Sequence, residues 1–286
     1  MSDALVQLRT TAPSTRFVTE SRSRFGHELT FDGNSKITAR GGSFEAPVPN
    51  ALSLVQVTDC PEATPMCSAS CYVHQLERYQ PAIHAAYRRN SDEIREAIRA
   101  YDGGDPEPLR HLATLVVEHV TAYAIPDFRW HVSGDVLDRT HAAWIRAVVA
   151  RTPETRHWIY TRRTHPAILN QLLAVDGLTV NLSADRDNFD AMLRIWRRYE
   201  HHPRAPRLTY MVTSADDTPE LPPGSVLFPD YALRPPNGTS PLNGAWWRSL
   251  SKAQRRQVCP VDYFGKGPSR RCGPCSKCLD PTADAP

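Results

Sequence analysis

No stretch of the sequence stays apolar over the length of a membrane span, and the first ten residues, MSDALVQLRT, lack the apolar core of a secretory signal peptide. We therefore expect a cytoplasmic protein with no membrane partner. The excess of basic over acidic residues is small, because 34 Lys and Arg face 31 Asp and Glu, which gives a net charge of +3. A charge of this size neither demands nor excludes nucleic acid as a partner.

Cysteine is rare, at seven of 286 residues, and the seven are unevenly spread: three lie near residue 60 and four near residue 270. An odd number cannot be paired completely within the chain, and a reducing cytoplasm disfavours structural disulfides. Clustered cysteines in such a compartment are typical of metal sites or catalytic groups. We predict that both sets bind metal.

The rest of the composition, 41% hydrophobic and 23% charged, is that of a globular protein. Residues 1–50 are rich in Ser, Thr, Gly and Pro without sustained periodicity, which predicts an irregular N-terminal arm. Strand and helix patterns then alternate, and such alternation implies an α/β fold with parallel strands, either a doubly wound sheet or a barrel. We predict a six-stranded partial (βα)6 TIM-like barrel over residues 51–235 and a C-terminal cysteine-rich metal-binding segment over residues 236–286.

Six segments carry strand patterns, namely 52–57, 128–132, 157–160, 178–182, 208–212 and 225–228. Polar residues follow them and would share the carboxyl-terminal rim where α/β proteins carry out chemistry. They are Cys60, Ser133, Asp135, Thr161, Arg162, Asn181, Ser183, Asp185, Ser214, Asp216 and Asp230. Ser, Asp and Asn in such places also cap helices, which explains any single one equally well.

The first cysteine set is Cys60-x6-Cys67-x3-Cys71, in the segment CPEATPMCSASCYV. Three thiolates can ligate three irons of a [4Fe-4S] cluster and leave the fourth iron open to a small molecule. They can equally hold zinc together with a water or a fourth ligand such as His74.

The second set is Cys259-x12-Cys272-x2-Cys275-x2-Cys278. Four cysteines with CxxC spacing strongly indicate a metal site. A four-thiolate zinc ribbon and a fully ligated [4Fe-4S] cluster both fit this spacing.

The order of a strand, a three-cysteine loop and further β-α units over residues 50–232 resembles the radical S-adenosylmethionine enzymes. Their usual loop is CxxxCxxC with an aromatic residue before the last cysteine. Here Cys67 and Cys71 supply the CxxxC part, Tyr72 follows, His74 stands where the third cysteine is expected, and Cys60 would serve instead.

That resemblance implies roles for two further groups of residues. Ser133, Gly134 and Asp135 stand where the superfamily holds the methionine amino group of S-adenosylmethionine, and Asn181, Ser183 and Asp185 stand where it contacts the ribose or the methionine carboxylate. It also implies an electron donor and a radical that abstracts hydrogen from a small-molecule or nucleotide substrate, which the sequence does not identify.

More of the chain resembles the phage-associated gene product 88 family, which implies a phage-related protein but little established activity. The resemblance is carried by Asn34-Ser35-Lys36, Cys60-Pro61, Cys67, Cys71-Tyr72, the run WHVSGD from Trp130 to Asp135, Tyr160-Thr161, Asn181-Leu182-Ser183 and the terminal cysteines.

Three hypotheses follow. The first is an iron-sulfur enzyme of the radical type, with an open [4Fe-4S] cluster on the first set and an auxiliary cluster on the second. The second is a zinc-stabilised nucleic-acid-binding protein of the replication type, of phage or plasmid origin, that uses the terminal ribbon and nearby basic and aromatic residues. The third is a non-catalytic electron-transfer protein, against which the barrel-like order of elements argues.

Overall fold

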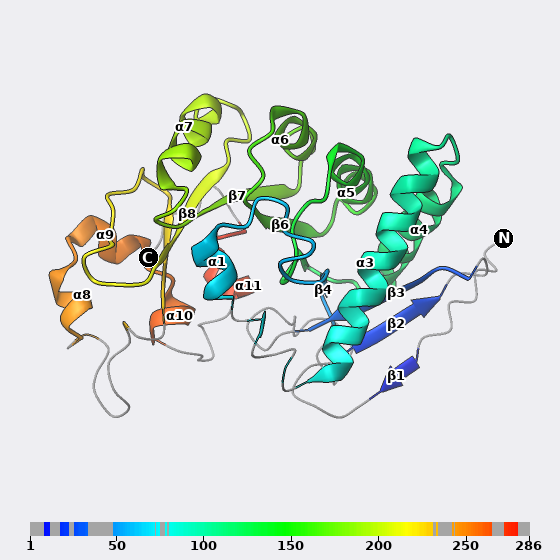
Figure 1. Ribbon diagram of the computed structural model, residues 1–286, viewed down its shortest axis with the longest axis horizontal. Helices are drawn as coiled ribbons and strands as arrows, with labels where there is room; N and C mark the ends of the chain where they lie inside the picture. Colours follow the sequence, from blue (N-terminus) through cyan, green and yellow to red (C-terminus); the bar gives the residue numbers. More distant parts are fainter. Residues whose placement is uncertain are drawn as a thin grey trace.

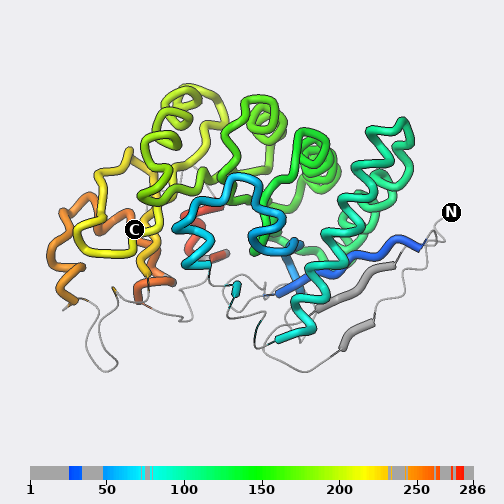
Figure 2. Tube along the Cα trace, viewed as in Figure 1, coloured from blue at the N-terminus to red at the C-terminus, as the bar shows by residue number. Residues whose placement is uncertain are grey.

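The computed structural model describes residues 9–11, 18–22, 26–33, 48–71, 73–74, 78, 80–230, 233, 242, 244–264 and 272–279. In this part of the chain nine strands form one sheet, and their order across the sheet, β1 to β9, is their order in the sequence. Figure 1 shows helices α5, α6 and α7 ranged along one side of it. In Figure 2 the colours pass accordingly along the molecule, from blue at β3 through cyan and green to yellow.

The first strands are antiparallel and extend the sheet at its N-terminal edge. They are β1 Arg9–Thr11, β2 Val18–Arg22 and β3 Glu28–Asp32, and β3 pairs antiparallel with β4, Ala51–Leu52. The predicted irregular arm is therefore wrong for these segments. In β3 the alternating Leu29 and Phe31 are fully buried, but a run this short gives little periodicity to detect.

Several residues that carried sequence predictions lie outside the described part of the chain. They are Asn34, Ser35, Lys36 and Tyr72. The division of the chain at residues 50 and 235 stays a prediction.

The other strands run parallel to β4. They are β5 Asp127–Trp130, β6 Arg156–Thr161, β7 Leu178–Ala184, β8 Arg207–Val212 and β9 Val226–Pro229. The α/β class and the parallel strands are confirmed. β1 and β9 form the two edges, so the sheet is open and not a closed barrel. Because each strand neighbours its predecessor, the strand order does not reverse as it does in a doubly wound sheet.

Helices cover one face of the parallel strands. α3 Pro81–Asp102 and α4 Glu107–Ala122 precede β5, while α5 Arg139–Arg151, α6 Pro166–Leu172 and α7 Phe189–Tyr199 connect later strands. Local signals start two of them: Asp138 accepts a hydrogen bond from the His141 amide at the start of α5, and Pro166 lies in the first turn of α6. No helix in the described residues is long and apolar enough to cross a membrane.

Strand alternation sends different side chains to the two faces of the sheet. Ile159 of β6 and Val180 of β7 join the core beneath the helices, together with Trp130 and Trp144. Trp158 of β6 joins a second, smaller cluster that includes Leu279 from the C-terminal segment. The sheet is therefore covered on both faces.

The cover on the second face is the cysteine-rich C-terminal segment. It contains α8 Ala245–Ser249, α9 Lys252–Gln257, α10 Pro260–Phe264 and α11 Cys272–Cys275. The Thr179 hydroxyl donates to the Leu279 carbonyl at 2.7 Å, and the Asn181 side-chain amide donates to the Cys278 carbonyl at 3.1 Å. In Figure 1, α11 accordingly lies by β6 and β7, away from the row of α5, α6 and α7. The segment packs directly on the sheet.

Candidate functional site

The first three cysteines lie on a loop that leaves the sheet earlier than predicted. The strand expected over residues 52–57 ends at Leu52, and the loop then passes along the end of β5: the Leu54 amide donates to the Ser133 carbonyl at 2.9 Å, and the Asp135 amide donates to the Asp59 carbonyl at 2.7 Å. These bonds hold the loop against the end of the neighbouring strand.

A short helix inside the loop, α1 Pro65–Ala69, anchors it to the end of β7. Thr64 caps α1 by accepting from the Cys67 amide at 2.9 Å, and its hydroxyl donates to Asp185 Oδ2 at 2.6 Å. The Met66 amide donates to Asp187 Oδ2 at 2.9 Å. Loop and strand ends are thus joined by polar contacts, so the cysteines lie on the carboxyl-terminal rim as predicted.

The thiols of Cys60, Cys67 and Cys71 are partly buried and close enough to interact electrostatically. Burial, reinforced by the nearby Asp135 carboxylate, raises the pKa of Cys60 to about 12. Burial also raises the pKa of Cys67, while the Arg162 guanidinium opposes that shift. The Cys60 and Cys67 thiols are therefore protonated at neutral pH, and a cation bound beside them would favour the thiolates.

Three polar side chains line the rim beside these cysteines. Arg162 Nη1 lies 2.8 Å from Asp185 Oδ2, in an ion pair whose side chains are 9% and 0% exposed. The Arg162 amide donates to Asp135 Oδ2 at 2.8 Å. The predicted common rim is confirmed for Asp135, Arg162 and Asp185, which come from the ends of three successive strands.

The residues predicted to contact S-adenosylmethionine separate into two places. Ser133, Gly134, Asp135 and Asp185 lie at the rim, and the buried Ser133 hydroxyl has no hydrogen-bond partner in the part of the chain that the structure describes. Asn181 lies on the second face, where its side-chain amide donates to the Ile159 and Cys278 carbonyls. The structure thus brings Asn181 to the second cysteine set, whereas the contacts predicted for the whole group stay predictions.

Gly134 and Ser183 have local roles in the structure. Gly134 has a φ of +81°, and a Cβ there would lie 2.6 Å from the Leu54 Cβ, so glycine permits the close approach of the cysteine loop. The Ser183 carbonyl accepts from the Asn188 side-chain amide at 3.4 Å, just before α7 begins.

The second set converges on the other face of the sheet. The Cys259 amide donates to the Leu227 carbonyl of β9 at 2.8 Å, and its side chain packs with Val226, Phe228 and Cys278. Cys272, Cys278 and Tyr160 pack against the cluster that contains Trp158 and Leu279, and Cys275 interacts electrostatically with Cys278. Burial raises the pKa of Cys278 to about 11. Four cysteines that span twenty residues of the chain therefore meet at β6 and β9.

Cations and a phenol surround this second set. The Arg129 guanidinium lies 4.8 Å from the Tyr160 ring centroid, and the Tyr160 hydroxyl is hydrogen-bonded to the Cys278 sulfur. Arg207 and Lys277 interact electrostatically with Cys278, and Lys277 Nζ donates to the Val258 carbonyl at 3.2 Å. Positive charge close to a thiolate lowers the cost of burying it.

None of the seven cysteines, all within the described residues, forms a disulfide. No three His, Cys, Asp or Glu side chains in the described ranges form a ready group of metal ligands. His74 was considered as a fourth ligand, but its Nδ1 lies 2.9 Å from the Gln56 side-chain amide and its Nε2 lies 3.1 Å from the Ser68 carbonyl. Both ring nitrogens thus contact groups of the loop itself.

Sequence reasoning missed several residues of these sites. Arg162 was predicted to lie on the rim, but its burial in an ion pair was not predicted, and Thr64 and Tyr160 had no assigned chemical role. The signal for Tyr160 was its position in β6, two residues from Trp158 and on the same face. In the nucleic-acid hypothesis, the Trp247 ring stacks on Tyr263 with centroids 5.2 Å apart, whereas Arg255 is exposed, with its guanidinium 5.8 Å from the Trp247 centroid.

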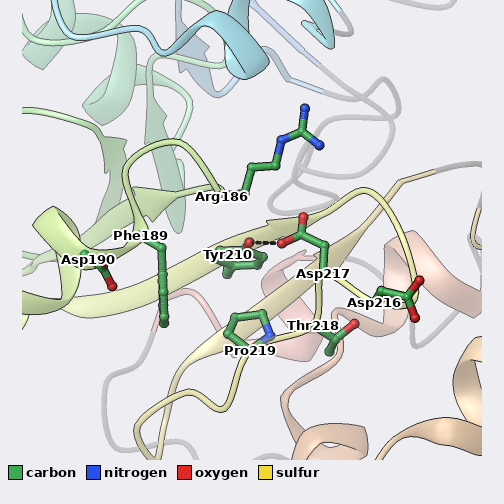
Figure 3. A pocket seen from close by; sticks show the side chains of 8 residues that line it. All are labelled: Arg186, Phe189, Asp190, Tyr210, Asp216, Asp217, Thr218 and Pro219. Carbon is green, nitrogen blue, oxygen red and sulfur yellow. Dashed lines mark hydrogen bonds between the residues drawn. The ribbon is translucent and has the colours of Figure 1, made fainter.

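A pocket of about 330 Å³ lies beyond Asp185, between the start of α7 and the loop after β8. It is lined by Arg186, Phe189, Asp190, Tyr210, Asp216, Asp217, Thr218 and Pro219 (Figure 3). The Tyr210 hydroxyl donates to Asp217 Oδ1 at 2.5 Å, and the Arg186 guanidinium points away from that pair. Of the predicted rim residues, Asp216 lines this pocket.

Comparison with known proteins identifies relatives of the chain. The sequence model of a family described as "Gene product 88" matches residues 27–281. The Gene 88 protein of Mycobacterium phage L5 is 30% identical over 162 residues, which cover 53% of this chain and 63% of the phage protein. The match thus spans less than two thirds of that relative's length. No solved structure matches the chain.

These comparisons give no support to the resemblance to radical S-adenosylmethionine enzymes, which stays a prediction. The predicted family and phage relationship are confirmed, since the matching model covers most of the sequence, including all seven cysteines. The chain belongs to the gene product 88 family.

Proposed function

We propose that this protein is an iron-sulfur enzyme with an open cluster on Cys60, Cys67 and Cys71 and a fully ligated cluster on the four C-terminal cysteines. The observation that carries the proposal is the gathering of the seven cysteines into two groups on one sheet, with the first at the carboxyl-terminal rim beside Asp135, Arg162 and Asp185. Thiolates are the ligands that iron-sulfur clusters require.

The donor sets fit such clusters in number and chemistry. Three cysteines leave one iron position open, and four close it. Cysteines that serve only as apolar filler need not lie close to one another, whereas these thiols are grouped closely enough that neighbours in each set raise the pKa of Cys60 and of Cys259. Because the described side chains do not yet form a ligand group, loading is expected to draw the sulfur atoms of each set together.

The rim offers groups for a polar cofactor or substrate next to the open position. When bound with S-adenosylmethionine, an open cluster supplies one-electron chemistry. The Ser133 hydroxyl, buried without a hydrogen-bond partner among the described residues, is available to hold an amino group, and Arg162 would hold a carboxylate in exchange for Asp185. The parallel strands β4 to β9, in sequential order, would form the partial barrel that encloses the reaction.

Metal analysis of anaerobically purified protein tests the proposal. We expect iron and acid-labile sulfide, with both reduced in Cys67→Ala and in Cys275→Ala and unchanged in Ser70→Ala. Ser70 is an exposed residue of the same loop, so this variant is the matched control. Zinc without sulfide would contradict the proposal, and simultaneous loss of both centres in Cys67→Ala would contradict the division into two sites.

Electron paramagnetic resonance of the reduced protein tests the open position. Adding S-adenosylmethionine is expected to change the signal that Cys67→Ala lacks, because a ligand to the open iron alters its electronic state. An unchanged signal would contradict binding of this cofactor at the first set while leaving the iron-sulfur assignment intact.

A further inference from the structure

Tyr160 occupies a special place between the sheet and the second cysteine set. It lies on the face of β6 that the C-terminal segment covers, where Tyr160, Cys272 and Cys278 pack against one cluster that includes Trp158 and Leu279. The Phe228 ring of β9 meets it edge-on, with centroids 5.7 Å apart. Its hydroxyl is the donor in a hydrogen bond to the Cys278 sulfur.

Arg129 of β5 reinforces this contact. Its guanidinium carbon lies 4.8 Å from the centroid of the Tyr160 ring, within the range of a cation-π interaction. Two further cations, Arg207 and Lys277, interact with the same sulfur, and Lys277 is 8% exposed. The Cys278 backbone carbonyl is also hydrogen-bonded, because the Asn181 side-chain amide donates to it at 3.1 Å.

This arrangement differs from what a purely structural metal site needs. Four thiolates around a metal carry net negative charge, and adding an electron makes that charge larger. Donors and cations aimed at the sulfur atoms favour the reduced state, since hydrogen bonds to cluster sulfurs and burial set the reduction potential. A structural zinc site would be stabilised by the same groups, but it has no reduction potential for them to shift.

We propose that Tyr160, supported by Arg129, raises the reduction potential of a cluster held by the four C-terminal cysteines and thereby makes it a redox-active centre. This inference rests on the proposed function at that set. The step is the transfer of one electron from an external donor to the cluster; no bond forms or breaks, and the phenol keeps its proton.

The position of Tyr160 also connects the two cysteine sets along one strand. Arg162, two residues further along the chain, is hydrogen-bonded to Cys67 of the first set. Residues Tyr160 and Arg162 are about 7 Å apart in an extended chain. A redox centre at Tyr160 is thus adjacent to the rim, where an electron can be used.

The test is a redox titration followed by electron paramagnetic resonance, in a Cys67→Ala background so that the C-terminal cluster alone contributes. Tyr160→Phe removes one hydroxyl and keeps the ring, and it is expected to lower the potential with unchanged iron and sulfide content. Arg129→Gln is expected to shift it in the same direction. Tyr199→Phe removes the same hydroxyl from a tyrosine of α7, where it donates to Asn170 Oδ1 at 2.8 Å, so this variant is the control and should leave the potential unchanged.

The outcomes separate this inference from the function on which it rests. If Tyr160→Phe binds the iron-sulfur cluster with an unchanged reduction potential, the inference is overturned and the proposed function stands. Loss of the cluster in Tyr160→Phe would also overturn it, because the hydroxyl would then be structural. Zinc in place of iron at the C-terminal set would defeat both.

Discussion

The two cysteine sets lie on one sheet, but cations are more numerous around the second set than around the first. At the rim, Cys60 and Cys67 face the Asp135 and Asp185 carboxylates, and the nearby Arg162 is already paired with Asp185. On the second face, Cys278 meets Tyr160 and the cations Arg129, Arg207 and Lys277, whereas Cys259 faces the Asp262 carboxylate. Carboxylates oppose the formation of thiolates, whereas phenols and cations favour it.

Because of this difference, cysteine ligands in one protein can serve two purposes, an open centre at the rim and an enclosed centre on the second face. Cations beside the second set offset part of the negative charge of a four-thiolate centre. The sheet covers this set on one side, and the C-terminal segment covers it on the other. The rim set depends on the metal for its positive charge and has polar groups in reserve for a cofactor or substrate. We therefore expect the rim centre to be the more easily lost of the two.

The largest effect expected is that of pH on the protein without metal. Burial lowers the pKa of His119 to about 4 and those of His131 and His157 to about 3, from 6.5. Below pH 6.5 the unfolded chain binds protons at these histidines, whereas the folded chain does not until the pH approaches 4 to 3. Their contribution to the free energy of unfolding is therefore complete above pH 6.5 and is lost as the pH falls toward 3. Denaturant titrations at several pH values measure this.

The cysteines act at the other end of the pH scale. Cys60 and Cys278 keep their protons in the folded chain to about pH 12 and 11, whereas the unfolded chain releases them near pH 9. Stability of the metal-free protein should therefore fall as the pH rises through 9. Cys60→Ser should reduce this alkaline loss and leave the acid loss unchanged; equal alkaline loss in both proteins would show that the rim thiol is not buried.

The second effect is the loss of the buried ion pair at the rim. Arg162→Met leaves the fully buried Asp185 without its cation, which should lower the free energy of unfolding by about 3–5 kcal/mol. Arg186→Met is the control, because that side chain is 65% exposed and lies 3.7 Å from Asp187. A loss below about 1 kcal/mol for Arg162→Met would indicate a solvated pair.

The third effect separates the two sets sterically. Gly134→Ala puts a Cβ 2.6 Å from the Leu54 Cβ and should displace the cysteine loop, so that the rim centre is lost and the C-terminal centre is retained. Gly177→Ala has similar backbone strain, at φ +85°, but its Cβ would have a nearest neighbour at 3.7 Å. The backbone strain common to both variants should lower the free energy of unfolding by about 1–2 kcal/mol. Any further loss in Gly134→Ala measures the clash with Leu54. Equal metal content in the two variants would contradict a rigid rim.

The sequence predicted the rim because strand ends can be counted. Asp135, Arg162 and Asp185 each follow a strand whose apolar pattern is clear, and parallel pairing brings them together whatever their side chains do. The strands of the N-terminal arm were not predicted, because two or three apolar residues, such as Leu29 and Phe31, are too few to show a periodicity.

The surroundings of the second set could not be predicted for a different reason. Nothing in the spacing of Cys259, Cys272, Cys275 and Cys278 states which surface they will cover, since that depends on long-range packing against β6 to β9. Asn181 illustrates the point: its place near a strand end predicted the rim, but the alternation along β7 sends it to the opposite face.

The smallest effect concerns the tether between the cysteine loop and the start of the β6–α6 connection. Glu62 Oε2 accepts from the Thr164 hydroxyl at 2.7 Å, and its other oxygen lies 3.3 Å from Arg163 Nη1. Glu62→Gln keeps the shape and one acceptor, so it should cost no more than about 1 kcal/mol, less at high salt. Glu107→Gln, in an exposed pair with Arg110 on α4, is the control. If the tether positions the rim set, Glu62→Gln lowers iron occupancy there and spares the C-terminal set; an equal loss at both sets would show that the two regions respond as one.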